Sequence, residues 1–177
     1  MSIDYSEDRL IQKSAAELME TELGWASVYA YDKEVLGENG TLGRNSFHEV
    51  LLIQQFRLAL KKLNPWINDK QIAEAIERMT ERMSSQTLMQ INEQKYQFIR
   101  DGIPVTRIKP DGTSEEIKAV VIDFENVDNN NFLCVRELWV YGALYRRRAD
   151  IVGFVNGIPL LFVELKNHNI EVENAFN

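Results

Sequence analysis

The residues best suited to chemistry lie near the C-terminal end of the sequence. Asp150 begins a β-rich run, and Glu164 and Lys166 close an apolar run over 158–163. Glu164 and Lys166 are two residues apart, so their side chains share one face of a strand. Carboxylates that converge on Mg²⁺ beside a cation can hydrolyse phosphodiesters, because the metal activates water and stabilises developing negative charge. This pattern favours a metal-dependent phosphodiesterase site.

The hairpin between the two strands decides whether Asp150 and Glu164 lie together. We predict its turn at Asn156–Gly157, a dipeptide typical of two-residue hairpin loops. A strict two-residue turn pairs Asp150 with Val163, which puts the two carboxylates on opposite faces. A three-residue loop or one bulge would pair Asp150 with Phe162 and bring the carboxylates together. The active-site interpretation therefore requires one extra residue.

The same charges also fit a non-catalytic docking module, in which Asp150, Glu164 and Lys166 form only a salt-bridge cluster. The apolar run 158–163 predicts a strand buried in the middle of a sheet, with its terminal charges at a rim. Ionisable groups around a buried strand end are costly unless they are paired or bind a metal, which favours a functional site.

The charge distribution bears on nucleic-acid binding. The chain has a formal net charge of -7, which argues against strong affinity for phosphates. Residues 1–38 carry nine acidic residues against three basic ones, so the surplus is concentrated there. The densest basic run is Arg146, Arg147 and Arg148, immediately before Asp150. These arginines are candidate DNA contacts, and a solvated strand end is the alternative.

Composition excludes several classes of protein. The 177 residues are 45% hydrophobic and 27% charged, which predicts one globular domain over 1–177. One cysteine and two histidines, without a CxxC or HExxH motif, argue against a zinc site. The acidic start does not resemble a secretory signal, and no apolar stretch approaches the length of a membrane span. We expect a cytoplasmic protein without a membrane segment.

Hydrophobic periodicity predicts helices in the first hundred residues and strands after residue 103, hence a mixed α/β (α+β) fold. The expected helices cover 11–22, a segment from a Ser46–Glu49 capping box to about 64, a segment from Asn68–Gln71 to 83, and 88–99. The expected strands, about five, are 105–108, 118–124, 132–141, 150–155 and 158–166.

Beyond these patterns, the sequence closely resembles the N-terminal nuclease domain of type I restriction enzyme R subunits. The similarity covers nearly the whole chain and is carried by Arg147–Val152, Phe154–Leu160, Val163–Asn167, Asn131–Phe132, Leu63–Pro65, Asn92 and Gly102–Val105. The resemblance implies a PD-(D/E)xK nuclease, that is, a restriction-endonuclease-like core with a central mixed sheet flanked by N-terminal helices.

The resemblance also implies site roles. Asp150 and Glu164 would be the principal Mg²⁺ ligands, and Lys166 would position or help deprotonate the attacking water. We favour a fixed positive charge for Lys166, because two nearby carboxylates would keep it protonated. Glu7 matches an acid near the start of the family's first helix and shares a stripe with Ile11 and Leu18. It is a further candidate metal ligand; the alternative is an acid that favours the helix N-terminus.

Two departures from the family's pattern qualify these roles. Ala149 stands where that pattern usually has proline, which loosens the backbone before Asp150 without removing its carboxylate. The family also carries a Gln and a Tyr, four residues apart, on the helix after the Glu-x-Lys strand. This chain ends before that helix is complete, so we expect an N-terminal fragment with an unfinished site.

By the same resemblance, the full subunit would carry an ATP-driven DNA translocase motor and cut double-stranded DNA. It would assemble with modification and specificity subunits that use S-adenosylmethionine. The sequence contains no GxxxxGK[ST] loop, so we expect no ATP hydrolysis by this chain. A stand-alone repair or recombination nuclease of the same fold is the remaining alternative, although such enzymes usually need a basic groove.

Overall fold

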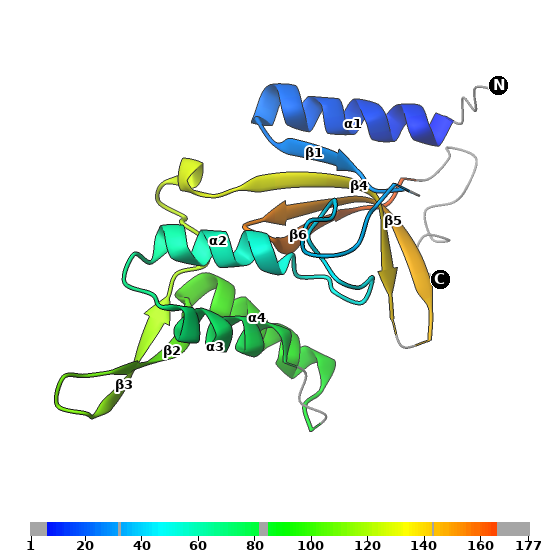
Figure 1. Cartoon of the computed structure of the whole chain (residues 1–177). Helices are drawn as coiled ribbons and strands as arrows, with labels where there is room; N and C mark the ends of the chain where they lie inside the picture. The colour runs from blue at the N-terminus through cyan, green and yellow to red at the C-terminus, as the bar shows by residue number, and fades with distance from the viewer. Residues whose placement is uncertain (1–6, 32, 82–84, 143, 166–177) are drawn as a thin grey trace. The chain divides into compact units, whose positions relative to one another are not determined.

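The computed structural model describes residues 7–31, 33–81, 85–142 and 144–165, with side chains from residue 11 on. It has the mixed α+β architecture that the sequence predicts (Figure 1). The chain divides into two compact units, one formed by residues 1–52 and 132–177 and the other by residues 53–131.

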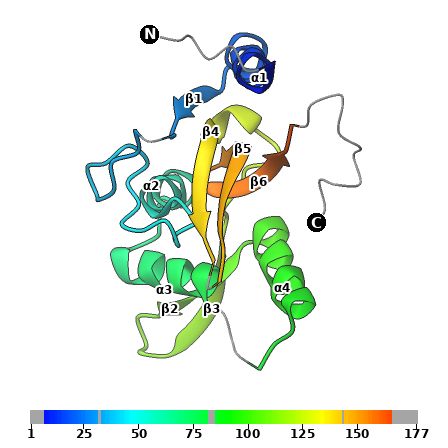
Figure 2. The same cartoon turned by 90° about the vertical axis from the view of Figure 1, so that its right-hand side faces the viewer.

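The first unit contains a four-stranded mixed sheet. Its strands, in spatial order, are β1 (Ala26–Tyr29), β4 (Phe132–Tyr141), β5 (Arg146–Val155) and β6 (Ile158–Val163). β1 runs parallel to β4, and the other neighbouring pairs are antiparallel. Helix α1 (Glu7–Leu23) lies along the sheet near β1 (Figures 1 and 2).

Each face of this sheet has its own apolar cluster. The helix-side core joins Ala16 of α1 to the sheet residues Cys134 and Ile151. The loop-side core joins the segment after β1 to the other face and contains Ala30, Leu42, Leu52, Leu133, Val135, Leu138, Ala149, Val152 and Phe154. Each face of the sheet is therefore covered over part of its area, and β4 and β5 are its most buried strands.

Two predictions about the first unit are wrong. β1 lies in a region expected to be helical, because its four residues are too few for alternation to be visible in the sequence. The prediction that Ile11 and Leu18 lie on the packed face of α1 is also wrong. Their side chains are 48% and 60% exposed, whereas Gln12 and Ala16 are buried. The stripe that Glu7 was expected to share is thus not the packed face of the helix.

The second unit consists of α2 (Ile53–Leu63), α3 (Asp69–Thr80), α4 (Leu88–Asp101), the hairpin β2 (Ile103–Ile108) and β3 (Ser114–Ala119), and a 3₁₀ turn at Val127–Asn129. The predicted capping box between Asn68 and Gln71 is confirmed at α3. The strand predicted at 118–124 is wrong: β3 occupies 114–119, because the turn around Gly112 is tight and Lys109 N–H bonds the carbonyl of Thr113.

The capping box predicted at Ser46 and Glu49 is wrong as well. The Glu49 carboxylate accepts a hydrogen bond from the backbone N–H of Asn45, and the Ser46 hydroxyl accepts one from His48 N–H. These bonds stabilise a turn, and α2 begins only at Ile53. Side chains of Ser and Glu can satisfy a turn as well as a helix start, so the motif alone does not distinguish them.

Near the middle of the sheet, β4 and β5 both exchange the faces to which their alternating side chains point. A regular strand returns to one face every second residue. In β4, however, the loop-side core contains Val135 and Leu138, which are three residues apart. In β5 it contains Ala149 and Val152, which are also three residues apart. The ladder stays in register on both sides, and Glu137, with a left-handed backbone (φ 58°), lies at the exchange. One left-handed residue thus redirects both strands.

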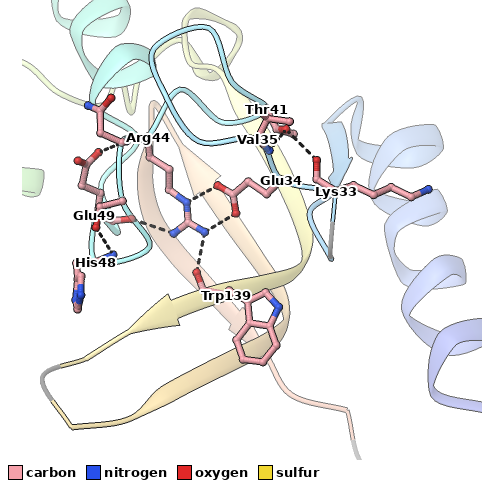
Figure 3. A network of polar contacts seen from close by, with 10 residues as sticks. Lys33, Glu34, Val35, Thr41, Arg44, His48, Glu49 and Trp139 are labelled. Carbon is pink, nitrogen blue, oxygen red and sulfur yellow. Dashed lines mark hydrogen bonds and ion pairs between the residues drawn. The ribbon is translucent and has the colours of Figure 1, made fainter.

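A buried arginine ties the segment after β1 to β4 (Figure 3). The Arg44 guanidinium donates to both carboxylate oxygens of Glu34, at 2.5 and 2.6 Å. It also donates to the backbone carbonyls of Glu49 and Trp139, at 3.1 and 2.7 Å. The side chains of Arg44 and Glu34 are 1% and 3% exposed, so this ion pair is shielded from water.

Substituting Arg44 by Leu should destabilise the chain by about 3–5 kcal/mol, because it leaves the Glu34 carboxylate buried without its counter-charge. The double substitution Arg44→Leu with Glu34→Leu should recover at least half of that loss. Urea unfolding monitored by circular dichroism measures both free energies. A single substitution that costs less than about 1 kcal/mol would show that the pair is not needed.

Replacing Glu137 by Gly and, separately, by Ala tests the left-handed backbone. Both variants lose the Glu137 carboxylate, so their difference reports on the Cβ atom. Because glycine has no steric penalty at positive φ, we expect the Gly variant to be more stable by about 1 kcal/mol in urea unfolding. The control is Val140 in the same strand, where Ala should be more stable than Gly. The same order at both positions would contradict the prediction.

Candidate active site

The hairpin that carries the candidate acids begins with the predicted two-residue turn. Asn156 and Gly157 both have left-handed backbones (φ 52° and 81°), as a type I′ turn requires. Phe154 pairs with Pro159, but Gly153, which precedes Phe154 in β5, pairs with Leu161. Leu160 is therefore an extra residue in β6, and the bulge that the active-site interpretation requires is present.

The bulge determines which residue faces Asp150. Beyond it, Ile151 pairs with Val163 and Val152 with Phe162. Extending this register by one residue sets Asp150 opposite Glu164. The predicted pairing of Asp150 with Phe162 is wrong, because the extra residue lies in β6 after a two-residue turn. Directly opposite residues share a face, so the two acids are neighbours across the strands.

Local contacts bring the end of β6 to Asp150. The carboxylate of Asp150, which is half-buried, accepts a hydrogen bond of 2.7 Å from the backbone N–H of Leu165. Val163 and Leu165 pack against the helix-side core, while Glu164 between them is exposed. Lys166 and the side chain of Glu7 lie outside the described residues. The structure thus brings together Asp150 and Glu164 of the predicted set.

β6 is not the central strand that its apolar run predicts. It pairs with β5 and forms the edge of the sheet within the described residues. Leu160, Leu161 and Phe162 are 48%, 38% and 65% exposed. An apolar run indicates low polarity but not which element covers it, so the sequence cannot distinguish an edge strand from a central one.

Next to the candidate acids lies a carboxylate that the sequence analysis missed. The β4–β5 pairs on either side, Arg136 with Ile151 and Leu138 with Ala149, set Glu137 opposite Asp150, and the Glu137 side chain is 6% exposed. It forms an ion pair of 2.6 Å with Arg148. A single acid inside the apolar strand 132–141 was the available signal, because a charged group there must find a partner.

The basic run before Asp150 lies on β5 itself. Arg146, Arg147 and Arg148 are exposed and pair across the ladder with Tyr141, Val140 and Trp139, respectively. They therefore stand on the same strand as Asp150, two to four residues from it.

The chemistry available to these groups is that of oxygen ligands. Among the described residues no cluster of three or more His, Cys, Asp or Glu side chains could hold a metal ion. Asp150 and Glu164 nevertheless supply two carboxylates, the donor type that Mg²⁺ prefers. Burial raises the pKa of the Cys134 thiol, so it stays neutral and is a poor nucleophile. None of the described helices has the length and hydropathy of a membrane span.

Comparison with known proteins identifies the family. Residues 4–177 match the family described as type I restriction enzyme R protein N terminus. The HindI endonuclease subunit of a type I restriction enzyme from Haemophilus influenzae is 31% identical over 160 residues, which cover 88% of this chain and 15% of that protein. A Methanocaldococcus jannaschii protein, provisionally named the MjaIXP endonuclease subunit of a type I restriction enzyme, is 27% identical over 177 residues, or 97% of this chain and 16% of that protein.

A third relative has the same kind of name. The SauCOLORF180P endonuclease subunit of Staphylococcus aureus, also from a type I restriction enzyme, is 25% identical over 161 residues, or 88% of this chain and 16% of that protein. The chain thus spans less than one fifth of the length of these relatives. Because the family match extends over almost every residue, the chain belongs to the type I restriction enzyme R protein N-terminal family.

Proposed function

We propose that this chain carries the endonuclease site of a type I restriction enzyme R subunit and hydrolyses phosphodiesters of double-stranded DNA with Mg²⁺. The observation that supports this most directly is the bulge at Leu160, which sets Asp150 opposite Glu164. Two carboxylates at one position supply the oxygen ligands that Mg²⁺ prefers.

The proposed roles follow from the chemistry of each group. Asp150 and Glu164 would hold Mg²⁺, which when bound would activate a water molecule and stabilise negative charge on the phosphate. Lys166 would act as a fixed positive charge beside the phosphate, because two nearby carboxylates would favour its protonated form. Glu7 is proposed as an additional ligand. Of the predicted basic run, Arg146 and Arg148 are proposed as contacts to the DNA backbone.

The remaining machinery would be supplied by other parts of the enzyme. We propose that residues 1–177 form the N-terminal nuclease domain of a longer subunit, with an ATP-dependent motor downstream that delivers DNA to the site. Specificity and modification subunits, the latter with S-adenosylmethionine, would recognise the target. The acidic net charge of -7 agrees with a nuclease to which DNA is delivered. Such a complex would work in the cytoplasm, where the DNA is.

A structural role for Asp150 is the competing interpretation. Its hydrogen bond with the Leu165 N–H ties the end of β6 to β5, and a docking module would need no more from this carboxylate. The two interpretations differ in one respect. Holding the Leu165 N–H requires only an oxygen acceptor, whereas binding a divalent cation requires the negative charge.

The substitution Asp150→Asn separates these two roles, because the amide keeps an acceptor oxygen and removes the charge. In a complete R subunit within its restriction complex, we expect Mg²⁺-dependent plasmid cleavage to fall by about 100-fold or more, with unchanged ATP-driven translocation. Glu164→Gln and Lys166→Ala should behave in the same way. Wild-type cleavage by Asp150→Asn would favour the docking module.

Metal binding can be tested on the 177-residue chain itself. Mn²⁺ at about tenfold its Kd should raise Tm by about 4 °C, because a ligand that binds only the folded state stabilises it. Asp150→Asn and Glu164→Gln should abolish this shift. Glu77→Gln, which removes an exposed acid from α3, is the matched control and should keep it. An equal shift in all variants would mean that the metal binds elsewhere.

A further inference from the structure

A row of aromatic rings and cations in mutual contact crosses the sheet of the first unit. Its rings are Tyr29 and Tyr31 at the end of β1 and Trp139 and Tyr141 at the end of β4. Its cations are Lys33, Arg136, Arg146 and Arg148, each stacked over one or more of these rings. We call this set the cation–aromatic ladder.

The ladder is continuous from one strand to the next. The Arg148 guanidinium lies 4.8 Å from the centre of the Tyr31 ring and 5.9 Å from that of Trp139. Trp139 meets Tyr141 edge to face, with ring centres 6.5 Å apart, and Arg146 lies 5.6 Å from the Tyr141 ring centre. This part of the ladder therefore joins the segment after β1 to β4 and β5.

The other end of the ladder is built in the same way. The Tyr29 ring centre lies 6.2 Å from that of Tyr31. The Arg136 guanidinium and the Lys33 ammonium lie 5.2 and 5.8 Å from the Tyr29 ring centre. Cations at such distances are attracted to the ring face, which restricts their side-chain motion.

The exchange at Glu137 puts all of these groups on one face of the sheet. Before it, Arg136 follows Cys134 by two residues and so shares the helix-side face; Tyr29 pairs directly with Arg136. After it, Leu138 and Ala149 face the loop-side core, so Trp139 and Arg148 face the helix side. The ladder therefore continues the face that α1 covers at the other end of the sheet.

The charge of the ladder contrasts with that of the chain. The chain has a net charge of -7, yet four cations are gathered here. Arg148 is paired with Glu137. Within the described residues, Lys33, Arg136 and Arg146 form no ion pair with a carboxylate, and Lys33 and Arg146 are exposed. Three cations without an ion-pair partner among the described residues, gathered beside a fourth that is paired, suit a polyanion.

We infer that the cation–aromatic ladder is the surface on which this chain holds the phosphate backbone of duplex DNA. This inference rests on the proposed nuclease function, whose DNA-binding surface it specifies. Because cations cover the ring faces, the rings hold arginines in place and do not stack on bases. Binding is therefore independent of sequence. Arg148 lies two residues from Asp150 on β5, so a DNA backbone on the ladder would pass close to this acid.

Only two of the three arginines in the basic run belong to the proposed DNA-binding surface. Arg146 and Arg148 belong to the ladder, whereas Arg147 pairs with Val140, which packs against the loop-side core on the opposite face. Arg147 is as exposed as its neighbours and carries the same charge. It is thus a matched control on the adjacent residue.

Fluorescence anisotropy with a labelled 20-base-pair duplex in EDTA, at about 25 to 150 mM KCl, tests the ladder. We expect Arg146→Gln to weaken binding about fivefold and to reduce the slope of log K against log salt by about 1. Arg147→Gln should stay within about twofold of the wild type. Tyr31→Leu should weaken binding about threefold with an unchanged slope, because no charge is lost, and Tyr31→Phe should restore it.

The ladder variants are scored by DNA binding in EDTA, and Asp150→Asn is scored by cleavage with Mg²⁺, so a failed cleavage test and a failed binding test remain distinguishable. Thermal melts establish that each variant is folded at the assay temperature. Equal losses in Arg146→Gln and Arg147→Gln would overturn the inference, as would wild-type binding by folded Arg146→Gln and Tyr31→Leu. Absence of salt-dependent binding by the wild type would also overturn it.

Discussion

The arrangement of the first unit depends on one constraint, the reversal of β4 and β5 at Glu137. The left-handed backbone of this residue makes both strands exchange faces while their ladder stays in register. Apolar residues on either side of the exchange can therefore enter the same loop-side core. The polar residues that alternate with them emerge together on the helix-side face, and Asp150 stands opposite Glu137 at the exchange itself.

Two ion pairs stabilise this arrangement from opposite sides of β4. On one side, Glu137 binds Arg148, which is also stacked between two rings. On the other side, Arg44 binds Glu34 and the carbonyl of Trp139. Desolvated charges of this kind add little net stability over apolar groups, but an unpaired partner is costly. The pairs therefore favour one geometry of the strands over alternatives that would separate them.

The candidate site combines a local feature with a long-range one. The bulge at Leu160 is local and brings Glu164 opposite Asp150. The position of Asp150 relative to β4 depends on the reversal, which involves residues more than ten positions away. Membership of the type I restriction enzyme R protein N-terminal family agrees with acids at the junction of these features.

Several elements could be predicted because their signals are local. The capping box at Asn68 and Gln71 and the turn at Asn156–Gly157 each satisfy their own backbone, so the residues themselves predict them. Ser46 and Glu49 show the limit, because the same side chains stabilise a turn here. β1 could not be predicted, because its four residues form a strand only through parallel pairing with β4, about a hundred positions later in the chain.

The sequence by itself determined the types of chemistry available: two carboxylates and a lysine around one hairpin and three arginines before it. It also showed that the site requires one extra residue in the hairpin, which the structure supplies at Leu160. It also sufficed to identify the family through an extended resemblance. Only the tertiary structure decided that Glu164 and not Phe162 faces Asp150, that β6 is an edge strand of the described sheet, and that Glu137 redirects two strands. The physical reason is that register, burial and strand reversal are properties of pairs of segments, and no single segment encodes its partner.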